Sequence, residues 1–443
     1  MQAPAKRPRV VIVGAGFGGL NAARGLAGSG AEIVVIDRTN HHVFQPLLYQ
    51  TATAALAESD IASPVRAILR SQREATVIMG EVTGVDPARQ VVAVKDTAEV
   101  AYDYLILAIG ADYSWFGHDE WSAHATVLKT LENAGTIRLR LLSAFEWAES
   151  RTDPQEIRRL LTFAIVGGGP TGVELAGSIA ELSRATLVRD FRRIRPESAR
   201  IVLCEAGPRL LAEFPHGLSD YAANALRSLG VEVRLGTKVE QIDAAGIVSS
   251  GERIACANTF WCAGTEARPA AAWLNAPAAH NRAVKVGPDC SVPDHPEVFV
   301  IGDASYLTGK DGKPLPGLAA VATQQGSYVA KVLASRIAGR PSPGPFRYRD
   351  RGTLAVIGRS RAVADLGRVQ LRGFPAWVFW SLVHLFLLAG FRNRVVVYVN
   401  WVWDWFTYAR GARLITGELP RDETGAPDPT GAADAGTTHA PAS

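Results

Sequence analysis

Two glycine-rich loops are the parts of this chain whose residue types and spacing most directly indicate chemistry. The first has the pattern GxGxxG at Gly14, Gly16 and Gly19, and Asp37 follows about 20 residues later. In such loops the backbone N–H groups at a helix N-terminus bind the pyrophosphate of a dinucleotide, and the acid accepts hydrogen bonds from the ribose hydroxyls. A glycine-rich turn in an ordinary α/β protein is the alternative.

The pattern recurs about 150 residues later. Gly167, Gly169 and Gly172 form the second loop, and Glu205 is the acid at the end of the following strand. Its distance from the loop is longer than usual because residues 183–198 are expected to extend the helical region. A carboxylate here repels a 2′-phosphate, which favours NADH over NADPH. The neighbouring Arg209 weakens that preference.

The elements that must position these loops are two strand–helix–strand units. The first is predicted as a strand at 9–13, a helix at 20–28 and a strand at 32–36. The second is predicted as a strand at 161–166, a helix at 173–182 and a strand at 200–204. Short apolar strands of this kind are typical of buried parallel sheets. We therefore expect an α/β fold with two Rossmann-like domains that bind two dinucleotides, most economically a flavin and a hydride carrier.

Composition is that of a globular protein of two or three domains, with 443 residues, 47% hydrophobic and 20% charged. The four cysteines form no CxxC pair, so we predict neither disulfides nor a metal site, and reduced thiols fit a cytosolic setting. His41 and His42 lack a third ligand and are interpreted as a loop feature. Residues 1–9 have no apolar signal region, and no stretch offers about 18 uninterrupted apolar residues.

Two further segments resemble flavoproteins of the disulfide-reductase type. Residues 104–111, which include Gly110, resemble the strand and turn between the FAD and NAD domains of those proteins. Residues 297–304 resemble their second FAD signature, in which an Asp binds the ribityl chain; here this is Asp303. Taken alone, Gly302-Asp303 could be a simple turn after a strand. The resemblance implies that the NAD domain is inserted into the FAD domain.

A closer resemblance, from Val10 to about Gly417, is to the type II NADH dehydrogenases, single-subunit NADH:quinone oxidoreductases of the membrane surface. The motifs that carry it occur in the same order, at residues 41–50 with 52–53, 169–176, 261–264, 322–326 with 328–331, 358–359 with 362–365, and 390–393. The implied reaction is hydride transfer from NADH to non-covalent FAD, then two-electron reduction of a membrane quinone without proton pumping.

The resemblance also assigns candidate residues. Implied for FAD are Gly14, Gly16, Gly19, Asp37, Gly110 and Asp303; implied for NADH are Gly167, Gly169, Gly172, Glu205 and Gly264. Glu174 matches a glutamate near the nicotinamide and quinone, although an acid in the first helical turn is also favoured by the helix dipole. Gln324 and Gln325 match a polar motif beside the flavin and quinone. Many relatives have Gln where this chain has Ala320, which leaves the details of quinone contact open.

The resemblance implies four regions, and composition adds a fifth. The four are FAD-binding residues 1–118 and 283–345, the NADH-binding domain at 119–282 and a membrane-association segment at 346–418. Residues 419–443, rich in Ala, Pro, Gly, Thr and Asp, are expected to be a disordered tail.

The region from Phe346 to Glu418 is basic and rich in tryptophan. It holds eleven arginines against four acidic residues, and five of the ten tryptophans lie within residues 374–405. Residues 374–390 are intensely apolar but too short to span a bilayer. Aromatic rings and arginines beside an apolar face favour the lipid headgroup boundary, so we expect amphipathic helices that bind the bilayer surface through residues 374–410. A buried helix pair or a homodimer interface is the alternative.

The sequence thus predicts a peripheral enzyme on the cytoplasmic face of the cell membrane, with NADH, quinone and lipid as partners and no nucleic acid. Three rivals stay open. A sulfide:quinone oxidoreductase would need a redox cysteine pair, for which only Cys256 and Cys262 are close in sequence. A soluble reductase would pass electrons to a protein such as a ferredoxin. A redox-sensing nucleotide-binding protein would have no turnover.

Overall fold

The structure is a computed structural model that describes residues 7–407 and 410–416. The chain forms two compact units, each built from separate segments. Unit 1 comprises residues 1–43, 62–112 and 265–351, and unit 2 comprises residues 44–61, 113–264 and 352–443. Residues 113–264 are therefore inserted between two parts of unit 1. The tail expected to be disordered, residues 419–443, lies outside the described residues.

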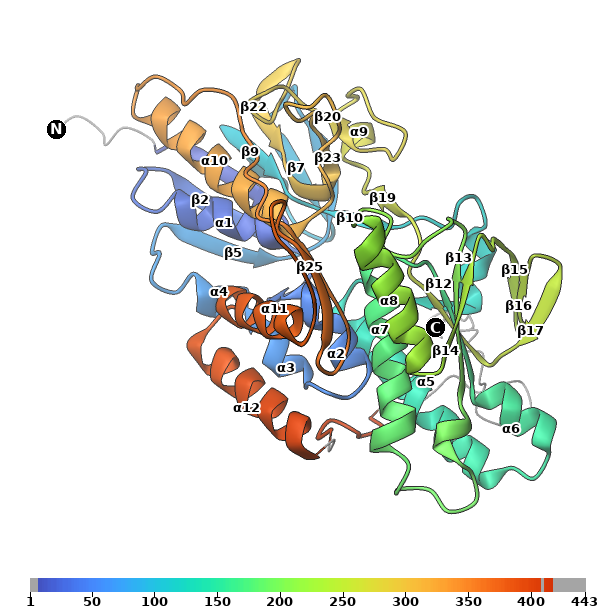
Figure 1. The fold of residues 1–443 in the computed structure, drawn as a ribbon. Helices are drawn as coiled ribbons and strands as arrows, with labels where there is room; N and C mark the ends of the chain where they lie inside the picture. The colour runs from blue at the N-terminus through green and yellow to red at the C-terminus, as the bar shows by residue number, and fades with distance from the viewer. Residues whose placement is uncertain (1–6, 408–409, 417–443) are drawn as a thin grey trace, which may run out of the picture. The chain divides into compact units, whose positions relative to one another are not determined.

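Unit 1 is built on a twisted sheet with the strand order β21-β22-β9-β1-β2-β5 within the described residues (Figure 1). Its strands are β1 (Arg9–Val13), β2 (Glu32–Asp37), β5 (Ala75–Met79), β9 (Tyr104–Leu107), β21 (Ser291–Val292) and β22 (His295–Val300). All neighbours pair in parallel except β21 with β22. The chain builds outward from β1 first on one side and then on the other, so the strand order reverses between β1 and β9. Open α/β sheets bind ligands at the carboxyl ends of strands at such a point.

The other elements of unit 1 cover this sheet or connect its strands. The helices are α1 (Phe17–Gly25), α4 (Val65–Ile68), α9 (Ala270–Trp273), η5 (Gly302–Ala304) and α10 (Ala319–Ile337). The smaller strands are β3 (His41–Val43), β4 (Ala62–Pro64), β6 (Val82–Asp86), β7 (Val91–Val94), β8 (Val100–Ala101), β20 (Val284–Lys285) and β23 (Ser305–Tyr306). The chain passes between the units five times: after residue 43, after residue 61, within β10 (Ala111–Tyr113), just before β19 (Thr265–Ala267) and after residue 351.

Alternation along β1 explains how this sheet is covered on both faces. Val10 and Ile12 belong to one core with α1 and α10, which lie side by side in Figure 1. Val11 and Val13 belong to a second core with β7 and α9. Because successive residues of a strand point to opposite faces, a strand buried on both sides must be apolar throughout. This requirement accounts for the Val-Val-Ile-Val run.

Unit 2 repeats this arrangement around a parallel sheet with the order β11-β18-β12-β13-β14 within the described residues. Its strands are β11 (Ala125–Val127), β12 (Thr162–Val166), β13 (Arg200–Glu205), β14 (Val231–Leu235) and β18 (Asn258–Trp261). The helices are η1 (Gln45–Leu47), α2 (Leu48–Ala52), α3 (Glu58–Ile61), η2 (Asp119–Ala123), α5 (Leu131–Ser150), α6 (Pro154–Leu160), α7 (Pro170–Glu181), η3 (Leu182–Thr186), η4 (Pro196–Ser198) and α8 (His216–Ser228). The two Rossmann-like sheets confirm the predicted fold class.

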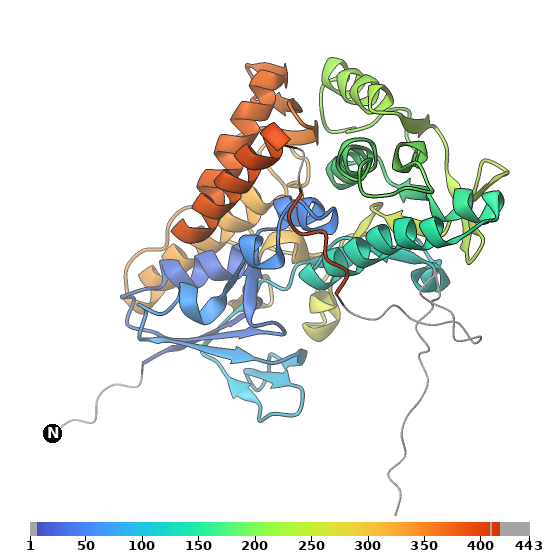
Figure 2. The same cartoon turned by 90° about the horizontal axis from the view of Figure 1, so that it is seen from below.

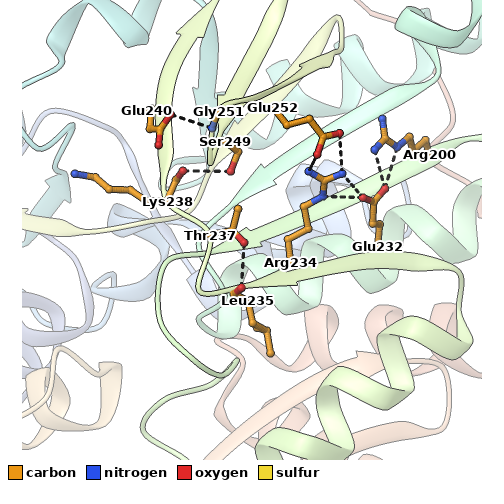
Figure 3. A network of polar contacts seen from close by, with 10 residues as sticks. All are labelled: Arg200, Glu232, Arg234, Leu235, Thr237, Lys238, Glu240, Ser249, Gly251 and Glu252. Carbon is orange, nitrogen blue, oxygen red and sulfur yellow. Dashed lines mark hydrogen bonds and ion pairs between the residues drawn. The ribbon is translucent and has the colours of Figure 1, made fainter.

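Two small antiparallel sheets complete unit 2. One is a meander of β15 (Val239–Asp243), β16 (Gly246–Ser249) and β17 (Glu252–Ala255). Figure 3 shows how Arg234 at the end of β14 holds it, with ion pairs of 2.5 Å to Glu232 and 2.8 Å to Glu252. The other sheet comprises β24 (Thr353–Gly358), β25 (Arg361–Asp365) and β26 (Gln370–Gly373). It packs against α7 and α8.

The C-terminal helices of unit 2 are α11 (Phe374–Leu387) and α12 (Phe391–Thr407). They lie next to each other in both views, coloured orange and red (Figures 1 and 2). Helix α11 packs on β25 and β26, and α12 packs on α3. None of the helices in the described part of the chain combines the length and the hydropathy that a bilayer-spanning segment requires.

Both nucleotide-loop helices begin three residues earlier than the sequence indicates. Helix α1 begins at Phe17 and α7 at Pro170, so the last glycine of each motif lies inside the helix. A Cβ atom on Gly19 would stand 1.8 Å from the carbonyl oxygen of Gly14, and one on Gly172 would stand 1.9 Å from that of Gly167. The expected helical extension at 183–198 consists only of the π-turn η3 and the short η4.

Gly177 sets the contact between α7 and β24, and a side chain there should weaken the fold. A Cβ atom would lie 1.6 Å from the carbonyl oxygen of Ile357, so Gly177→Ala forces the helix and the strand apart. We expect a loss of about 1–3 kcal/mol, the usual cost of overpacking, seen as a lower thermal-unfolding midpoint. Gly217→Ala on α8, where nothing lies within 4 Å, is the control. Equal midpoints for the two variants would contradict the close packing.

Candidate dinucleotide sites and a buried acidic pocket

The first glycine loop connects β1 to α1 and leaves the start of the helix open. Gly14 has φ +97°, and Gly16 is the N-cap of α1. Among the described residues no side chain caps this helix, and nothing lies within 4 Å of where a Cβ on Gly16 would be. Free N–H groups at a helix N-terminus, with room beside them, are what a phosphate requires. The loop therefore fits the pyrophosphate of a dinucleotide.

Asp37 stands at the carboxyl end of β2, next to this loop. Its carboxylate accepts hydrogen bonds from the backbone N–H groups of Ala15, at 2.6 Å, and Thr39, at 2.7 Å. The second imidazole of the His41-His42 pair lies under the same loop, since Nδ1 of His42 is 2.9 Å from the carbonyl oxygen of Ala15. Burial lowers the pKa of His42. His42 thus supports the loop as a neutral ring.

The other residues assigned to FAD lie at the same edge of the sheet. Gly110 follows β9, and Asp303 follows β22 within η5. Since β9 pairs in parallel with both β1 and β22, these strand ends are neighbours of the first loop. Unit 1 therefore brings together all six residues that the sequence assigned to FAD.

The two glutamines of α10 make hydrogen bonds within unit 1. The Gln325 side chain is buried, and its Oε1 accepts a hydrogen bond from the N–H of Gly302 at 2.7 Å. Gln324 exchanges two hydrogen bonds of 3.0 Å with the backbone of Arg349. Gln325 thus holds the turn that presents Asp303.

The second loop repeats the first in unit 2. Gly167 has φ +109°, Gly169 is the N-cap of α7, and no described side chain caps that helix. The Glu205 carboxylate accepts hydrogen bonds of 2.6 Å from the N–H groups of Gly168 and Gly207. Gly264 follows β18, the parallel neighbour of β12, and so lies at the same edge. The unusual loop-to-acid spacing therefore leaves Glu205 in the position that Asp37 has in unit 1.

Glu174 lies in the second turn of α7, and no acid lies in the first turn. The helix-dipole explanation weakens there, because the effect fades beyond the first turn. The Glu174 carboxylate instead borders a pocket of about 110 Å³ within unit 2, and its Oε1 accepts a hydrogen bond of 3.4 Å from Val356 N–H. The pocket is lined by Tyr49, Gln50, Ala55, Glu174, Ser178, Glu181, Thr186, Val356, Ile357, Gly358, Arg359, Trp377, Trp380, Ser381, Trp401, Asp404, Trp405 and Arg410.

Burial dominates the acid–base behaviour of this pocket. It raises the pKa of Glu174 to about 8 and that of Asp404 to about 6, and it also raises the pKa of Glu181. The pKa of Tyr49 is raised for the same reason. Glu174 is therefore a neutral acid at pH 7 that can release a proton under mildly alkaline conditions. A carboxyl group of this kind is suited to general acid–base chemistry.

Comparison with known proteins identifies the family. Residues 8–326 match the pyridine nucleotide-disulphide oxidoreductase family, and residues 351–408 match the NDH2 C-terminal domain. The chain is 42% identical over 429 residues to the type II NADH:quinone oxidoreductase Ndh of Mycobacterium tuberculosis, covering 94% of this chain and 92% of that one. The chain belongs to the type II NADH:quinone oxidoreductases.

A second family member agrees with this assignment, and a solved structure shares the fold. The type II NADH:quinone oxidoreductase NdhA of Mycobacterium tuberculosis is 40% identical, covering 93% of this chain and 90% of that one. The structure of NDH2 from Plasmodium falciparum in complex with NADH has the same fold, with a TM-score of 0.86 at 20% identity, covering 93% of this chain and 100% of that one. The predicted family is confirmed.

Sequence reasoning did not single out Glu181 or Asp404, and it counted Arg410 among the arginines expected to meet lipid headgroups, whereas Arg410 is buried beside Glu181. Glu181 could have been noticed because it lies seven residues after Glu174 in an apolar helix, and residues spaced by seven share a helix face. Asp404 and Arg410 give no such signal, since only the packing of α12 and the following segment brings them to α7. Among the described residues, no group of three His, Cys, Asp or Glu side chains could hold a metal.

The position of Glu205 predicts its effect on nucleotide selectivity. Replacing Glu205 with Ala removes a charged hydrogen-bond acceptor and a repulsive charge, so the KM for NADH should rise about tenfold or more and discrimination against NADPH should relax. Steady-state kinetics with both nucleotides measures this. Glu232→Ala is the control, because it removes a carboxylate from β14, the strand next to β13. Glu232 pairs with Val202, which lies three residues before Glu205 on β13. Unchanged kinetics of Glu205→Ala would remove Glu205 from the site.

Proposed function

We propose that this chain oxidises NADH and passes the electrons through FAD to a membrane quinone, without pumping protons. The observation that carries this proposal is the repeat of one nucleotide-binding geometry in both units, in a chain that also matches the NDH2 C-terminal domain. When bound, FAD supplies the two-electron chemistry that links the two substrates. The chain's own residues bind, orient and move protons.

The roles of individual residues follow from their places. Gly14, Gly16 and Gly19 present the N-terminus of α1 to the FAD pyrophosphate, and Asp37 receives a ribose of FAD. In unit 2, Gly167, Gly169 and Gly172 present α7 to NADH, and Glu205 receives its adenosine ribose. Gly110 and Asp303 contribute to the FAD site at the edge of the unit 1 sheet, and Gly264 contributes to the NADH site at the edge of the unit 2 sheet.

Three further residues are assigned to the reaction with quinone. The protonated Glu174 serves as the acid for quinone reduction. Gln324 and Gln325, carried over from the family motif, are proposed to border the flavin and quinone. Since both side chains are hydrogen-bonded to the backbone, we assign them the role of fixing the part of the site that they border.

Geometry argues against the sulfide-oxidising rival. Cys256 precedes β18 and Cys262 follows it, so a strand of four residues separates them. Such a strand is about 13 Å long, whereas the Cα atoms of a disulfide lie within about 7 Å. Both thiols also have pKa values raised by burial, which disfavours the reactive thiolate.

Rapid mixing tests the proposed function. The purified, full-length protein should carry FAD, its flavin should bleach within the turnover time when NADH is added without oxygen, and a short-chain quinone should restore the colour. Sulfide in place of NADH, and oxidised ferredoxin in place of the quinone, give the controls. If NADH leaves the flavin oxidised, or if the quinone cannot reoxidise it, the assignment is wrong.

Helices α11 and α12 support a membrane-surface location. Twelve of the eighteen large hydrophobic residues that are exposed in the described structure lie on these two helices. On α11, Phe374, Val378, Leu382 and Phe386 repeat every four residues and are exposed, whereas Ala376, Trp380 and His384 are buried. One apolar face of α11 is already buried in the protein, so its second, exposed apolar face needs a further apolar phase to cover it. We propose that this phase is the headgroup boundary of a bilayer, on the cytoplasmic face, where NADH is available.

Charged substitutions on this exposed face should release the protein from lipid. Leu382→Asp with Phe391→Asp, at positions 62% and 81% exposed, should reduce co-sedimentation with anionic vesicles by about tenfold or more. The control is Met79→Asp on β5, an apolar residue 64% exposed outside these helices. Unchanged lipid binding, with a change from dimer to monomer in sedimentation, would instead assign the face to a homodimer interface.

A further inference from the structure

A line of polar groups runs along one face of α7, beyond the residues that the proposed reaction uses. Glu174, Ser178 and Glu181 are spaced by four and three residues, so they share a helix face, and all three line the pocket. Glu174 and Glu181 retain partial exposure, so water in the pocket can reach their carboxyl groups. The pocket therefore connects two acids that lie two helical turns apart.

This separation is too long for a direct proton transfer but can be bridged. Seven residues of helix advance about 10.5 Å. Ser178 lies between the acids, and its Oγ is 2.7 Å from Oγ1 of Thr53. The volume of about 110 Å³ holds several water molecules, since about 15 Å³ of such space is enough for one. Within the described residues the buried indole N–H of Trp380 has no hydrogen-bond partner, so this wall also offers water a donor.

Opposite α7, a hydrogen-bonded chain from α12 and α2 borders the same pocket. The indole N–H of Trp401 donates to Oε1 of Gln50 at 2.7 Å, and Nε2 of Gln50 donates to the Tyr49 hydroxyl at 2.8 Å. The negative charges of Glu174 and Glu181 both act on the Tyr49 phenol and help to raise its pKa. The phenol thus lies within electrostatic reach of both acids.

At the far end of α7, Glu181 meets the segment that follows α12. Its carboxylate accepts a hydrogen bond from Arg359 N–H and lies 3.5 Å from Arg410, whose other terminal nitrogen donates to the carbonyl of Thr53 at 2.8 Å. Asp404 on α12 is partly exposed and lines the same pocket. Asp404 therefore offers a partly exposed titratable group on the wall of the pocket that Glu181 also lines.

The charges that face these acids come from every element around the pocket. They are Tyr49 on α2, Glu174 and Glu181 on α7, Arg359 after β24, Arg361 on β25, Asp404 on α12 and Arg410 beyond it. Arg410 stabilises the ionised form of both Glu181 and Asp404, while burial opposes it. Burial outweighs Arg410, so the pKa of each acid lies above its usual value.

We propose that this pocket is a proton-uptake route, in which Asp404 and Glu181 pass protons from solvent along α7 to Glu174. The proposal rests on the proposed function, because only quinone reduction demands such uptake. Each turnover converts NADH, one proton and a quinone into NAD⁺ and a quinol. The hydride brings two electrons and one proton, and the remaining proton is taken from solution. Glu174 gives that proton to the reduced quinone and regains it from Glu181 through water and the Ser178 hydroxyl.

Rapid mixing separates this route from the flavin chemistry. In Glu181→Gln and Asp404→Asn, flavin reduction by NADH should match the wild type. Reoxidation by a short-chain quinone should slow about tenfold at pH 8 and show a larger solvent deuterium isotope effect. The decline of the wild-type rate above about pH 8, where Glu174 loses its proton, should begin at lower pH in both variants. Formate should restore part of the rate in Glu181→Ala.

The matched control is Asp190→Asn, which removes an ion pair to the same C-terminal segment, at Arg413, without touching the pocket. A readout besides turnover is the infrared band of the Glu174 carboxylic acid, assigned with Glu174→Gln. Its exchange after a jump into deuterated buffer should slow in Glu181→Gln and not in Asp190→Asn.

The route is overturned if Glu181→Gln and Asp404→Asn both equal Asp190→Asn in three measurements. These are the rate of flavin reoxidation, the solvent isotope effect and the rate of proton exchange at Glu174. If Glu181→Gln fails to retain FAD, Asp404→Asn and Ser178→Ala decide the question, since neither removes the Arg410 ion pair. A wild-type protein that quinone cannot reoxidise would count against the proposed function and not against the route alone.

Discussion

The uncapped start of a helix beside an acid at the end of the next strand is the arrangement on which the rest of this structure depends. It occurs once in each unit, at α1 with Asp37 and at α7 with Glu205. The missing side-chain cap leaves backbone donors for a phosphate, and the missing Cβ of Gly19 and of Gly172 lets each helix approach its strand. In each unit the parallel sheet holds the start of the helix and the acid at the strand end next to each other.

Helix α7 has more than one task because of where it lies in unit 2. Its N-terminus faces the nucleotide loop, Gly177 at its middle touches β24, and Glu181 at its end meets Arg410. Burying carboxyl groups costs free energy unless they are paired or neutral, and this pocket uses both solutions. Glu181 is offset by Arg410, whereas Glu174 stays protonated at neutral pH because burial raises its pKa to about 8. Such a costly cluster is more readily understood as part of the chemistry than as a source of stability.

The C-terminal helices combine two opposite surfaces. Trp380 and Val397 are buried inside unit 2, while the exposed faces carry residues such as Phe386 and Phe391. Trp401 and Asp404 of α12 also line the acidic pocket, so the same helix borders both the exposed apolar face and the candidate proton route. This places the region expected to meet lipid in direct structural continuity with the acids of unit 2.

The sequence by itself determined the two nucleotide folds, because glycine spacing and apolar strands are local patterns with few structural solutions. Gly14 to Asp37 and Gly167 to Glu205 could be assigned for that reason, as could the apolar character of residues 374–406. The exact start of α7 could not be assigned from the sequence, and neither could the helical turn that holds Glu174. A glycine in such a motif is equally compatible with a loop and with a helix. Only the tertiary structure joined Glu181 to Asp404 and Arg410, more than 200 residues away. Their pKa values depend on burial by elements distant in sequence, and no local pattern encodes that environment.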